Sequence, residues 1–455
     1  MPSPRKGNNF TTPGTSIRSI NRQKNMTQKK SNIVAIITMC FIFAMISFVT
    51  NMAAPFGNLW SYQYTWAGMW GNLMNFTAYL FMGIPAGNMI IKYGYKKTAL
   101  IALAVGVVGL GVQLLSSVAG AGVAVFTVKG QVVALNLLIY LLGALICGFC
   151  VCMLNTVVNP MLNLLGGGGN RGNQLIQIGG TCNSLSATLT PMLTGVLVGT
   201  LSASTSMKDV APLVIAGMCI FAVAFIIISF IKIEEPQGDL SNVKYEKSPL
   251  AFRHCTLGII AIFFYVGVEI GIPGELNAYL SHMTDALGNP VVGAAAVGGT
   301  LAGFYWLLML CGRFISSLIS GKVATRTQMI VVTSAAILFL LVAIFLPESI
   351  TMDIKAVAVP VKCIFIFICG ICTSIMWGGI FNLSTEGLGK YTAKASGLFM
   401  TMVVGGGIMP LIQDAIGRSK AGYINSYWLI VAMLVFILYY SIWGYKNVNK
   451  DIPVD

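Results

Sequence analysis

The stretch LNTVVNP, residues 154–160, lies deep inside an apolar run that begins near Leu137. A run of this length is predicted to cross a lipid bilayer as one helix. The two carboxamides and the proline within it find no hydrogen-bond partners in lipid, so they need polar partners inside the protein. We therefore expect Asn155 to face a substrate cavity. The alternative is that it packs against a neighbouring helix.

The composition of the whole chain is that of a membrane protein. Hydrophobic residues make up 56% of the 455 residues, charged residues make up 9%, and the mean hydropathy is +0.80. A soluble protein cannot cover its surface with so few charges. The apolar runs are too long for barrel strands and show no alternation with a period of two. The sequence therefore predicts an all-α membrane protein.

The net charge of +14 is concentrated at the start of the chain, where residues 1–32 contain seven Lys and Arg and no acid. A basic segment ahead of a first membrane helix is typical of a cytoplasmic tail that touches anionic lipid headgroups. The charge therefore gives no reason to expect a nucleic-acid partner. We expect this tail to be disordered, and Met26 is an alternative start of the protein.

Twelve apolar runs are long enough to cross the membrane. The long polar connection at 233–253 divides them into an amino-terminal bundle of six helices, residues 33–232, and a carboxyl-terminal bundle of six, residues 254–446. Residues 447–455 follow as a short cytoplasmic tail. The expected helices lie near 33–57, 65–92, 98–119, 132–165, 173–201, 211–232, 254–284, 294–320, 327–346, 354–384, 394–415 and 421–446.

The distribution of basic residues agrees with this count. With both termini in the cytoplasm, the cytoplasmic segments hold 22 of the 28 Lys and Arg residues. Such a bias is what an even number of membrane crossings requires under the positive-inside rule. The six basic residues of the external loops are Lys129, Lys208, Lys355, Lys362, Arg418 and Lys420.

Several short motifs occur in one order along the chain. They are PAG at 85–87 with KYGYKK at 92–97, LNTVVNP at 154–160, CNSLSA at 182–187, YVGVE at 265–269, GRF at 312–314, GLGKYT at 387–392 and GGGIMP at 405–410. Together with the plan of six plus six helices, they resemble the L-fucose permease and glucose/galactose transporter branch of the major facilitator superfamily. The helix 4 motif of that branch is L-E-T-A-A-N-P, and its helix 5 motif is F-N-S-L-G-A.

This resemblance implies a major facilitator fold, with two six-helix halves built from inverted internal repeats and a binding site at the midplane. It also implies a secondary transporter of a bacterial inner membrane that works by alternating access. The expected substrate is a neutral hexose or deoxyhexose such as L-fucose, glucose or galactose. The expected mode of uptake is cation symport, with H⁺ or Na⁺ as the coupling ion.

Two departures from the family concern coupling. The fucose permease has a helix 1 Asp, tied to proton coupling, four residues before a Pro; here Asn51 stands four residues before Pro55. The helix 4 Glu of the family is Asn155 here. Up to Ile231 the only acid is Asp209, in an expected external loop. Composition therefore excludes a carboxylate proton relay in the first half, whereas sodium symport and uncoupled transport stay open.

Sugar hydroxyls require paired donors and acceptors, which Asn and Gln side chains provide together. The faces of a pyranose ring pack on flat aromatic groups, and a closed cavity keeps the polar contacts dry. The resemblance places Asn51, Asn155 and Asn183 on helices that line the cavity and implies an aromatic residue at Trp377. An alternative for Trp377 is a packing or interfacial role. The predicted substrate-binding residues are Asn155, Asn183, Trp377, Asn51, Asn382 and Gln177.

Glu269 is the predicted site for the coupling ion. An ionised Glu that faces lipid is too costly, so this side chain must face the cavity, pair with a cation or stay protonated. The Gly-Ile-Pro-Gly interruption at 271–274 indicates a broken helix, which is frequent at transporter sites. The alternative is a structural acceptor for a neighbouring Tyr or Trp. The predicted gating residues, near cytoplasmic helix ends, are Lys92, Lys96 and Arg313.

No nucleophile with a base and an orienting acid is recognisable, so we expect no enzyme and predict no catalytic residue, metal site or cofactor. Cysteine pairs such as 147/150 and 369/372 are interpreted as packing residues of helices. The open alternatives are a carrier of a nucleoside or an amino sugar, an uncoupled facilitator, and a sugar-sensing receptor on a transporter scaffold. We expect a monomer in a lipid bilayer that binds a sugar.

Overall fold

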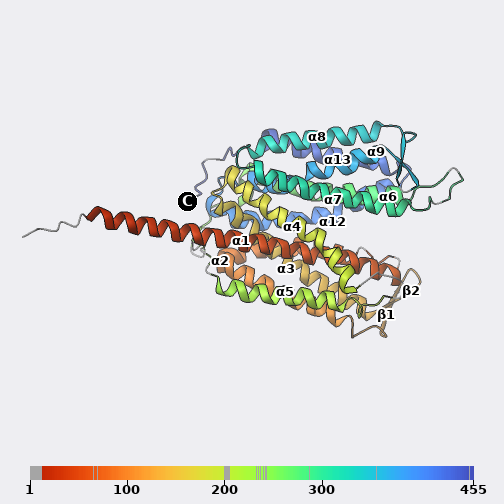
Figure 1. Cartoon of the computed structure of the whole chain (residues 1–455), viewed down its shortest axis with the longest axis horizontal. Helices are drawn as coiled ribbons and strands as arrows, with labels where there is room; N and C mark the ends of the chain where they lie inside the picture. Colours follow the sequence, from red (N-terminus) through yellow and green to blue (C-terminus); the bar gives the residue numbers. More distant parts are fainter. Residues whose placement is uncertain are drawn as a thin grey trace, which may run out of the picture.

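Helices that run along one common direction make up most of the chain (Figure 1). Within a bilayer the backbone satisfies its hydrogen bonds only inside helices or closed barrels, so long apolar runs fold as helices. The computed structural model describes residues 13–64, 66–68, 70–198, 205–231, 233, 235, 237–238, 240, 243–285, 287–289, 291–354, 356–449 and 451–454.

The helices form two groups. Those of the amino-terminal group, called the N-half, are α1 (Pro13–Gln63), α2 (Trp70–Leu115), α3 (Leu135–Leu165), α4 (Gly169–Val198) and α5 (Ala211–Phe230). Those of the C-half are α6 (Arg253–Ser281), α7 (Ala294–Ile319), α8 (Thr325–Phe345), α9 (Lys362–Thr373), α10 (Met376–Thr385), α11 (Thr392–Thr401), α12 (Gly405–Gly417) and α13 (Tyr423–Tyr439). Short turns at Pro249–Ala251, Gly389–Tyr391, Met402–Val404 and Tyr440–Gly444 extend or join them.

The described helices account for the twelve predicted crossings. Ten spans within the described residues are long and apolar enough to cross a membrane, and α9 with α10, like α11 with α12, counts as one. Helix α2 is 46 residues long and contains two crossings, because Gly94, with φ of 81°, interrupts it. Helix α4 has 30 residues and joins the end of α3 to the opposite end of the bundle, where α5 begins. Helix α4 carries many polar side chains, which lower its mean hydropathy. Its place in the membrane is compatible with them because they face other helices.

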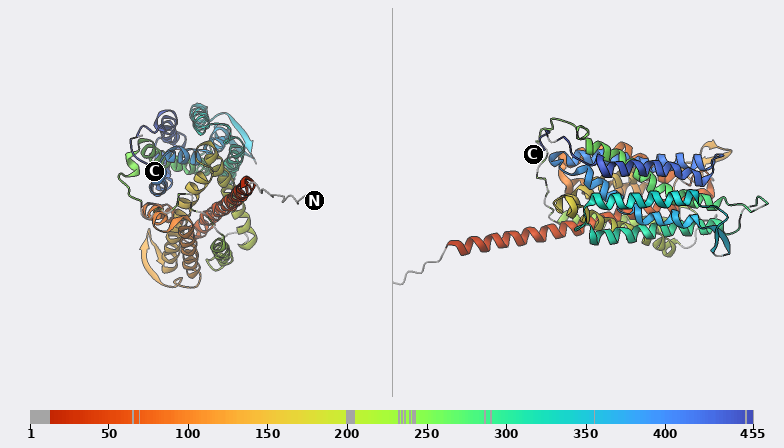
Figure 2. Two further views of the ribbon diagram at one scale, coloured as in Figure 1. Left: turned by 90° about the vertical axis from the view of Figure 1, so that its left-hand side faces the viewer. Right: turned by 90° about the horizontal axis from the view of Figure 1, so that it is seen from above.

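The first helix starts earlier than predicted. We expected residues 1–32 to be disordered, but α1 begins at Pro13, and its first part projects beyond the bundle (Figures 1 and 2). Proline suits the first turn of a helix because its fixed φ matches the helix and its missing N–H would have no partner there. Residues 15–54 contain neither Gly nor Pro, so nothing in the sequence ends the helix before the membrane.

Two β-hairpins were not predicted. Strands β1 (Ala124–Val128) and β2 (Gln131–Ala134) pair after α2, and strands β3 (Thr351–Ile354) and β4 (Val357–Pro360) pair after α8. The hairpins follow the third and the ninth crossing, which is the same place in each half. Lys129 and Gly130 both have positive φ, as a two-residue hairpin turn requires. The repeated hairpin is consistent with halves that are built on one plan.

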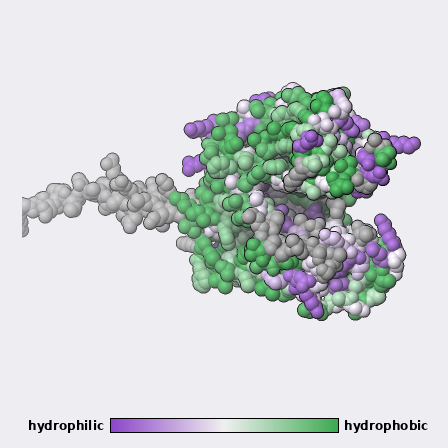
Figure 3. All heavy atoms as spheres, turned by 45° about the vertical axis from the view of Figure 1, so that its right-hand side comes forward, coloured by the Kyte–Doolittle hydropathy of each residue, from purple (hydrophilic) through white to green (hydrophobic). Residues whose placement is uncertain are grey.

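The two ends of the bundle differ. The free part of α1 and the carboxyl terminus lie at one end, called the terminal end, and the hairpins lie at the other, called the hairpin end (Figure 1). Figure 3, turned so that the hairpin end comes forward, shows a hollow between the two halves with polar residues beside it. The contacts between the halves described below lie in the terminal part of the bundle.

A close helix crossing seals the terminal end. Helix α2 of the N-half meets α11 of the C-half at Gly83 and Gly87, which face Gly397. A methyl group at position 83 would come within 2.5 Å of the backbone nitrogen of Thr401 and 2.7 Å of the Gly397 carbonyl oxygen. The halves approach this closely only because the position has no side chain.

We expect Gly83→Ala to disfavour the conformation described here, in which the two halves are in contact at the terminal end. The new methyl group would collide with backbone atoms, so the halves must separate. Overpacking of this kind costs about 1–3 kcal/mol. A cost of about 1.4 kcal/mol changes the ratio of the two conformations tenfold. Spin labels at the exposed Val132 and Val292, on different halves at the hairpin end, would report a larger short-distance population. The exposed Cys219 and Cys311 would be replaced by Ser.

Gly303→Ala is the matched control, because nothing lies within 4 Å of a methyl group at that exposed position. An unchanged distance distribution in Gly83→Ala would show that the α2–α11 contact does not limit the opening of the terminal end.

Candidate functional site

An ion pair lies within the C-half. The Arg313 Nη2 atom of α7 donates to the Glu269 Oε1 atom of α6 at 3.1 Å, and the two side chains are 11% and 13% exposed. The sequence predicted both residues, Glu269 as the coupling site and Arg313 as a gating residue near a helix end. The structure instead brings them together, because Arg313 lies inside α7, more than a helical turn before Ile319.

The same guanidinium also reaches the N-half. Its Nη1 atom donates to the Ser184 hydroxyl of α4 at 2.8 Å and, at longer range, to the Asn183 Oδ1 atom at 3.5 Å and the Gly180 carbonyl oxygen at 3.4 Å. Its Nε atom donates to the Ser374 carbonyl oxygen, at the break between α9 and α10, at 3.2 Å. Arg313 therefore ties α4 of one half to α6, α7 and α9 of the other.

Three carboxamides form a ladder along α3. Asn155, Asn159 and Asn163 are spaced by four residues and so lie on one helix face. The Asn155 Nδ2 atom donates to the Tyr79 hydroxyl of α2 at 2.8 Å, and Asn159 Nδ2 donates to the Asn155 carbonyl oxygen at 2.9 Å. The first step of the ladder is thus bound within the N-half.

The other two steps bond to the C-half. Trp377 Nε1 of α10 donates to the Asn159 Oδ1 atom at 2.9 Å, and Asn163 Nδ2 donates to the Asn382 Oδ1 atom at 2.9 Å. Asn382 in turn donates to the Thr325 hydroxyl at 3.2 Å. Since α3 runs from the hairpin end to the terminal end, these bonds lie on the terminal side of Asn155. They add polar contacts to the seal between the halves.

Trp377 has aromatic rings on its C-half side. Its ring lies edge to face with Tyr265 of α6, at a centroid distance of 6.4 Å, and with Phe399 of α11, at 6.0 Å. Trp377 is half-buried, while Tyr265 is fully buried and its hydroxyl donates to the Thr373 carbonyl oxygen. The indole is therefore held in one orientation between the halves.

The remaining predicted binding residues have other partners. Gln177 Nε2 donates to the Ile375 carbonyl oxygen at 3.1 Å, so Gln177, like Asn382, belongs to the seal between the halves. Asn183 Nδ2 donates to the Phe43 carbonyl oxygen of α1 at 3.0 Å. Asn51, half-buried in α1, donates to the carbonyl and the hydroxyl of Ser47 in its own helix.

The predicted gating lysines bind within the N-half. The Lys96 ammonium donates to the carbonyl oxygens of Ser229 at 2.9 Å and Ile231 at 2.7 Å, which closes the carboxyl end of α5. Lys92 is exposed, with its ammonium 5.2 Å from the Tyr93 ring centroid. In this conformation both lysines have contacts within one half, and their gating role stays a prediction.

Gln237, in the connection between the halves, bonds to both of them. The Tyr95 hydroxyl of the N-half donates to Gln237 Oε1 at 2.9 Å, and Gln237 Nε2 donates to the Gly389 carbonyl oxygen of the C-half at 2.7 Å. Beside it, the Glu235 carboxylate accepts from the backbone N–H groups of Tyr95 and Lys96, just past the break in α2. Nothing in the sequence pattern of this polar loop pointed to these pairings.

Asn159, Asn163 and Tyr79 were also missed as site residues. A signal for the two carboxamides was present, because their spacing from Asn155 places all three on one helix face. Tyr79 had no comparable signal, since its place beside Asn155 depends on how α2 and α3 pack. The arrangement offers donors and acceptors for a neutral polar molecule and one ion pair.

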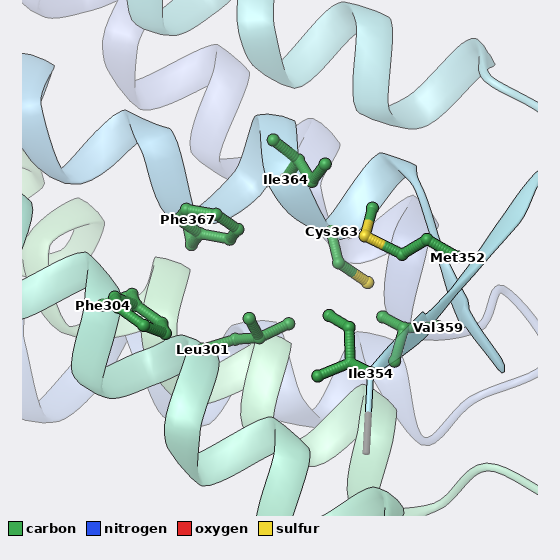
Figure 4. Close-up of a pocket in the computed structure, with 8 residues that line it drawn as sticks. All are labelled: Leu301, Phe304, Met352, Ile354, Val359, Cys363, Ile364 and Phe367. Atoms are coloured by element: carbon green, nitrogen blue, oxygen red, sulfur yellow. The ribbon is translucent and has the colours of Figure 1, made fainter. Parts of the chain in front are cut away.

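A pocket elsewhere in the C-half does not suit such a molecule. It has a volume of about 330 Å³ and lies between α7, α9 and the β3–β4 hairpin (Figure 4). Its lining presents carbon and sulfur atoms, so it offers no partner for hydroxyl groups. The lining residues are Leu301, Phe304, Met352, Ile354, Val359, Cys363, Ile364 and Phe367.

We expect the energies of the Glu269–Arg313 pair to be strongly non-additive. Glu269→Gln or Arg313→Gln alone leaves a largely buried charge without its partner, which costs about 3–5 kcal/mol. The double variant removes both charges and should lose clearly less than the sum of the two single losses. Unfolding of the purified protein in detergent by denaturant or heat measures the three differences. Simple additivity would mean that the two side chains do not interact in solution.

Comparison with known proteins agrees with this geometry. The family described as Major Facilitator Superfamily matches residues 31–411. The glucose/galactose transporter of Brucella abortus biovar 1 (strain 9-941) is 26% identical over 447 residues, which cover 95% of this chain and 100% of the relative. This match along the whole chain confirms the predicted resemblance to the glucose/galactose transporters.

Solved structures confirm the predicted fold. The E. coli fucose:proton symporter superposes with a TM-score of 0.74 at 17% identity, covering 90% of this chain and 98% of that one. The proton:xylose symporter bound to 6-bromo-6-deoxy-D-glucose gives a TM-score of 0.63 at 11% identity, covering 90% and 95%. With its twelve crossings in two halves, this multi-pass membrane protein belongs to the Major Facilitator Superfamily, a family of transporters and not of enzymes.

Proposed function

We propose that this protein is a secondary active transporter that takes up a neutral hexose by alternating access, coupled to a cation. The observation that carries the proposal is the carboxamide ladder of α3. Asn155 stands on the hairpin side of the seal, while Asn159 and Asn163 bind Trp377 and Asn382 of the other half. Polar groups of both halves therefore meet at the seal, and a hollow opens between the halves at the hairpin end (Figure 3).

The chemistry of these groups suits a sugar. Asn155 and Asn183 each supply a donor and an acceptor, and Trp377 supplies a flat surface on the C-half side. A hexose hydroxyl can replace Tyr79 or Phe43 as the partner of these carboxamides. The name of the Brucella relative supports glucose or galactose as the substrate. L-fucose is the third candidate, because the fold is that of a fucose:proton symporter.

The seal is of a kind that can open. A hydrogen bond contributes about 0.5–1.5 kcal/mol net between neutral groups and about 1.5–3 kcal/mol when one group is charged. The bonds from Trp377, Asn163 and Arg313 across the halves therefore contribute several kcal/mol. The Gly83 crossing adds close packing without any bond that must be broken. Rocking of the halves about the midplane would therefore exchange these contacts for similar ones at the hairpin end.

The orientation follows from the charges. The terminal end bears most of the basic residues, so we place it on the cytoplasmic side of a bacterial inner membrane. Both termini then lie in the cytoplasm. The described conformation is then open to the outside. We place the boundary between the halves within residues 233–253. Gln237, in this connection, bonds to the C-half at the terminal end. Both halves of the site come from one chain, which supports a functional monomer.

Counterflow in proteoliposomes tests the proposal. Vesicles loaded with unlabelled glucose, galactose, L-fucose, a nucleoside or an amino sugar would be scored for entry of the labelled compound without an ion gradient. We expect exchange of at least one hexose and a loss of about tenfold at low sugar concentration in Asn155→Ala, as one to two lost hydrogen bonds require. Asn425→Ala is the control, since that exposed Asn bonds only to the Ala421 carbonyl of its own helix among the described contacts.

Exchange of the nucleoside or the amino sugar in place of every hexose would contradict the substrate class. If the folded protein exchanges none of these compounds, the proposal that it transports them is wrong.

Trp377 allows a second test of the site. Trp377→Phe keeps a ring but removes the N–H donated to Asn159, so we expect it to keep sugar exchange within about threefold, as the loss of one hydrogen bond implies. Trp377→Ala also removes the stacking surface and should raise the sugar KM by about tenfold or more. Counterflow rates against sugar concentration separate the two variants. Equal sugar KM values in both variants and the wild type, with only stability reduced, would leave Trp377 as a packing residue.

A further inference from the structure

Helix α6 carries a second carboxylate, Glu275, whose charged surroundings differ from those of Glu269. Glu275 is only 4% exposed, and among the ion pairs of the described residues none includes it. Glu269, by contrast, is held by Arg313. A buried carboxylate without a cation is costly when ionised. The two acids of this helix are therefore in different electrostatic situations.

Glu275 points away from Arg313, toward α12 and α13. Its Oε1 atom lies 3.0 Å from the Ser426 hydroxyl of α13, and Gln413 Nε2 of α12 lies 3.4 Å from the same hydroxyl. A side chain at Gly417 of α12 would collide with the Glu275 carboxyl group. Helix α12 is thus fitted closely around this acid. The Gln413 Oε1 atom is buried there and has no hydrogen-bond partner among the described residues.

The hydrogens at Ser426 can be counted. Its hydroxyl oxygen lies 2.6 Å from the Tyr423 carbonyl oxygen and 3.0 Å from Glu275 Oε1, but a hydroxyl has a single hydrogen. If that hydrogen goes to the closer carbonyl oxygen, two oxygens without a hydrogen between them would face each other at Glu275. A proton on the Glu275 carboxyl group removes this conflict, because the acid then donates to the Ser426 oxygen.

The other charged and titratable groups around Glu275 do not supply a free cation. Asp414 and Arg418 interact electrostatically with it, but they bind each other at 2.7 Å. Tyr423 and Tyr427 face it from α13, and the Tyr427 hydroxyl donates to the Ile272 carbonyl oxygen. The charge balance of the site therefore favours a neutral Glu275.

The position of Glu275 along α6 connects it to a movable segment. Pro273 lies between Glu269 and Glu275 and removes one backbone hydrogen bond of the helix. The part of α6 beyond Pro273 lies on the hairpin side of the bundle. In this conformation Glu275 binds that part to α12 and α13. A change at Glu275 would alter how firmly the segment is held in the open position.

We propose that Glu275, and not Glu269, carries the coupling proton, and that the protonated acid holds the hairpin-side part of α6 in the open arrangement; this inference rests on the proposed function. Water at the open hairpin end gives one proton to a Glu275 carboxylate oxygen. After the halves have rocked and the sugar has left, the same O–H bond breaks and the proton passes to water on the other side. Lower external pH therefore favours the open state.

The experiment compares the wild-type protein with Glu275→Gln and Asp209→Asn in proteoliposomes that are alkaline inside. Counterflow is measured in each as the test of transport itself. For one proton per sugar, a gradient of one pH unit should give about tenfold accumulation of the hexose, since one unit corresponds to about 1.4 kcal/mol. We expect Glu275→Gln to exchange sugar within about threefold of the wild type and to accumulate none. Asp209→Asn, which removes an exposed carboxylate of the other half, should accumulate sugar like the wild type.

Accumulation by Glu275→Gln, or a wild type that exchanges sugar but ignores the pH gradient, would overturn the proton site and leave the proposed function intact. If the wild type exchanges no sugar, the proposed function fails, and a readout without substrate decides about Glu275. The infrared band of protonated carboxyl groups should then be present at neutral pH in the wild type and Asp209→Asn and be reduced in Glu275→Gln. An unchanged band would overturn the assignment.

Discussion

One guanidinium connects the parts of this transporter that must move relative to each other. Arg313 binds Glu269 in its own half and the Ser184 hydroxyl in the other half. An arginine is charged in every state of the cycle, so its hydrogen bonds have to be replaced whenever the halves separate. Glu269 keeps the charge neutralised during such an exchange. The ion pair therefore lets a permanent charge lie inside a membrane protein at a surface that opens and closes.

The rest of the seal combines many weak contacts with one close crossing. The bonds from Trp377 and Asn163 join neutral groups, and each is worth little by itself. The Gly83 crossing works differently, because close packing is sensitive to distance and is lost as soon as the helices separate. Such a seal is specific, since it fits only one arrangement, and still easy to break. Alternating access needs both properties.

The two acids of α6 show how environment separates the roles of identical side chains. Glu269 is paired with Arg313, whose positive charge offsets the charge of the ionised carboxylate. Glu275, less than two turns away, faces a hydroxyl and a carboxamide without a cation of its own. A transporter that lacks carboxylates in the membrane part of its N-half, as the sequence shows, can still keep one titratable group in the C-half. Proton binding would then lie in the C-half, while the positions of the two family carboxylates in the N-half, Asn51 and Asn155, carry no titratable group.

Hydropathy and charge by themselves determined that this chain is a helical membrane protein with twelve crossings in two halves, because the cost of exposing backbone and charge to lipid depends on local composition. The same cost singled out Asn155 and Glu269 as candidate site residues, since each is a polar residue within a predicted membrane helix, whereas Arg313 was predicted from its place near a cytoplasmic helix end. The partners were decided only by the tertiary structure. Arg313 meets Ser184, which is 129 residues away, and Trp377 meets Asn159, which is 218 residues away. Such contacts depend on the rotation and packing of whole helices, which no local pattern records; the same reason explains why Lys96 closes α5 while Gln237 joins the halves.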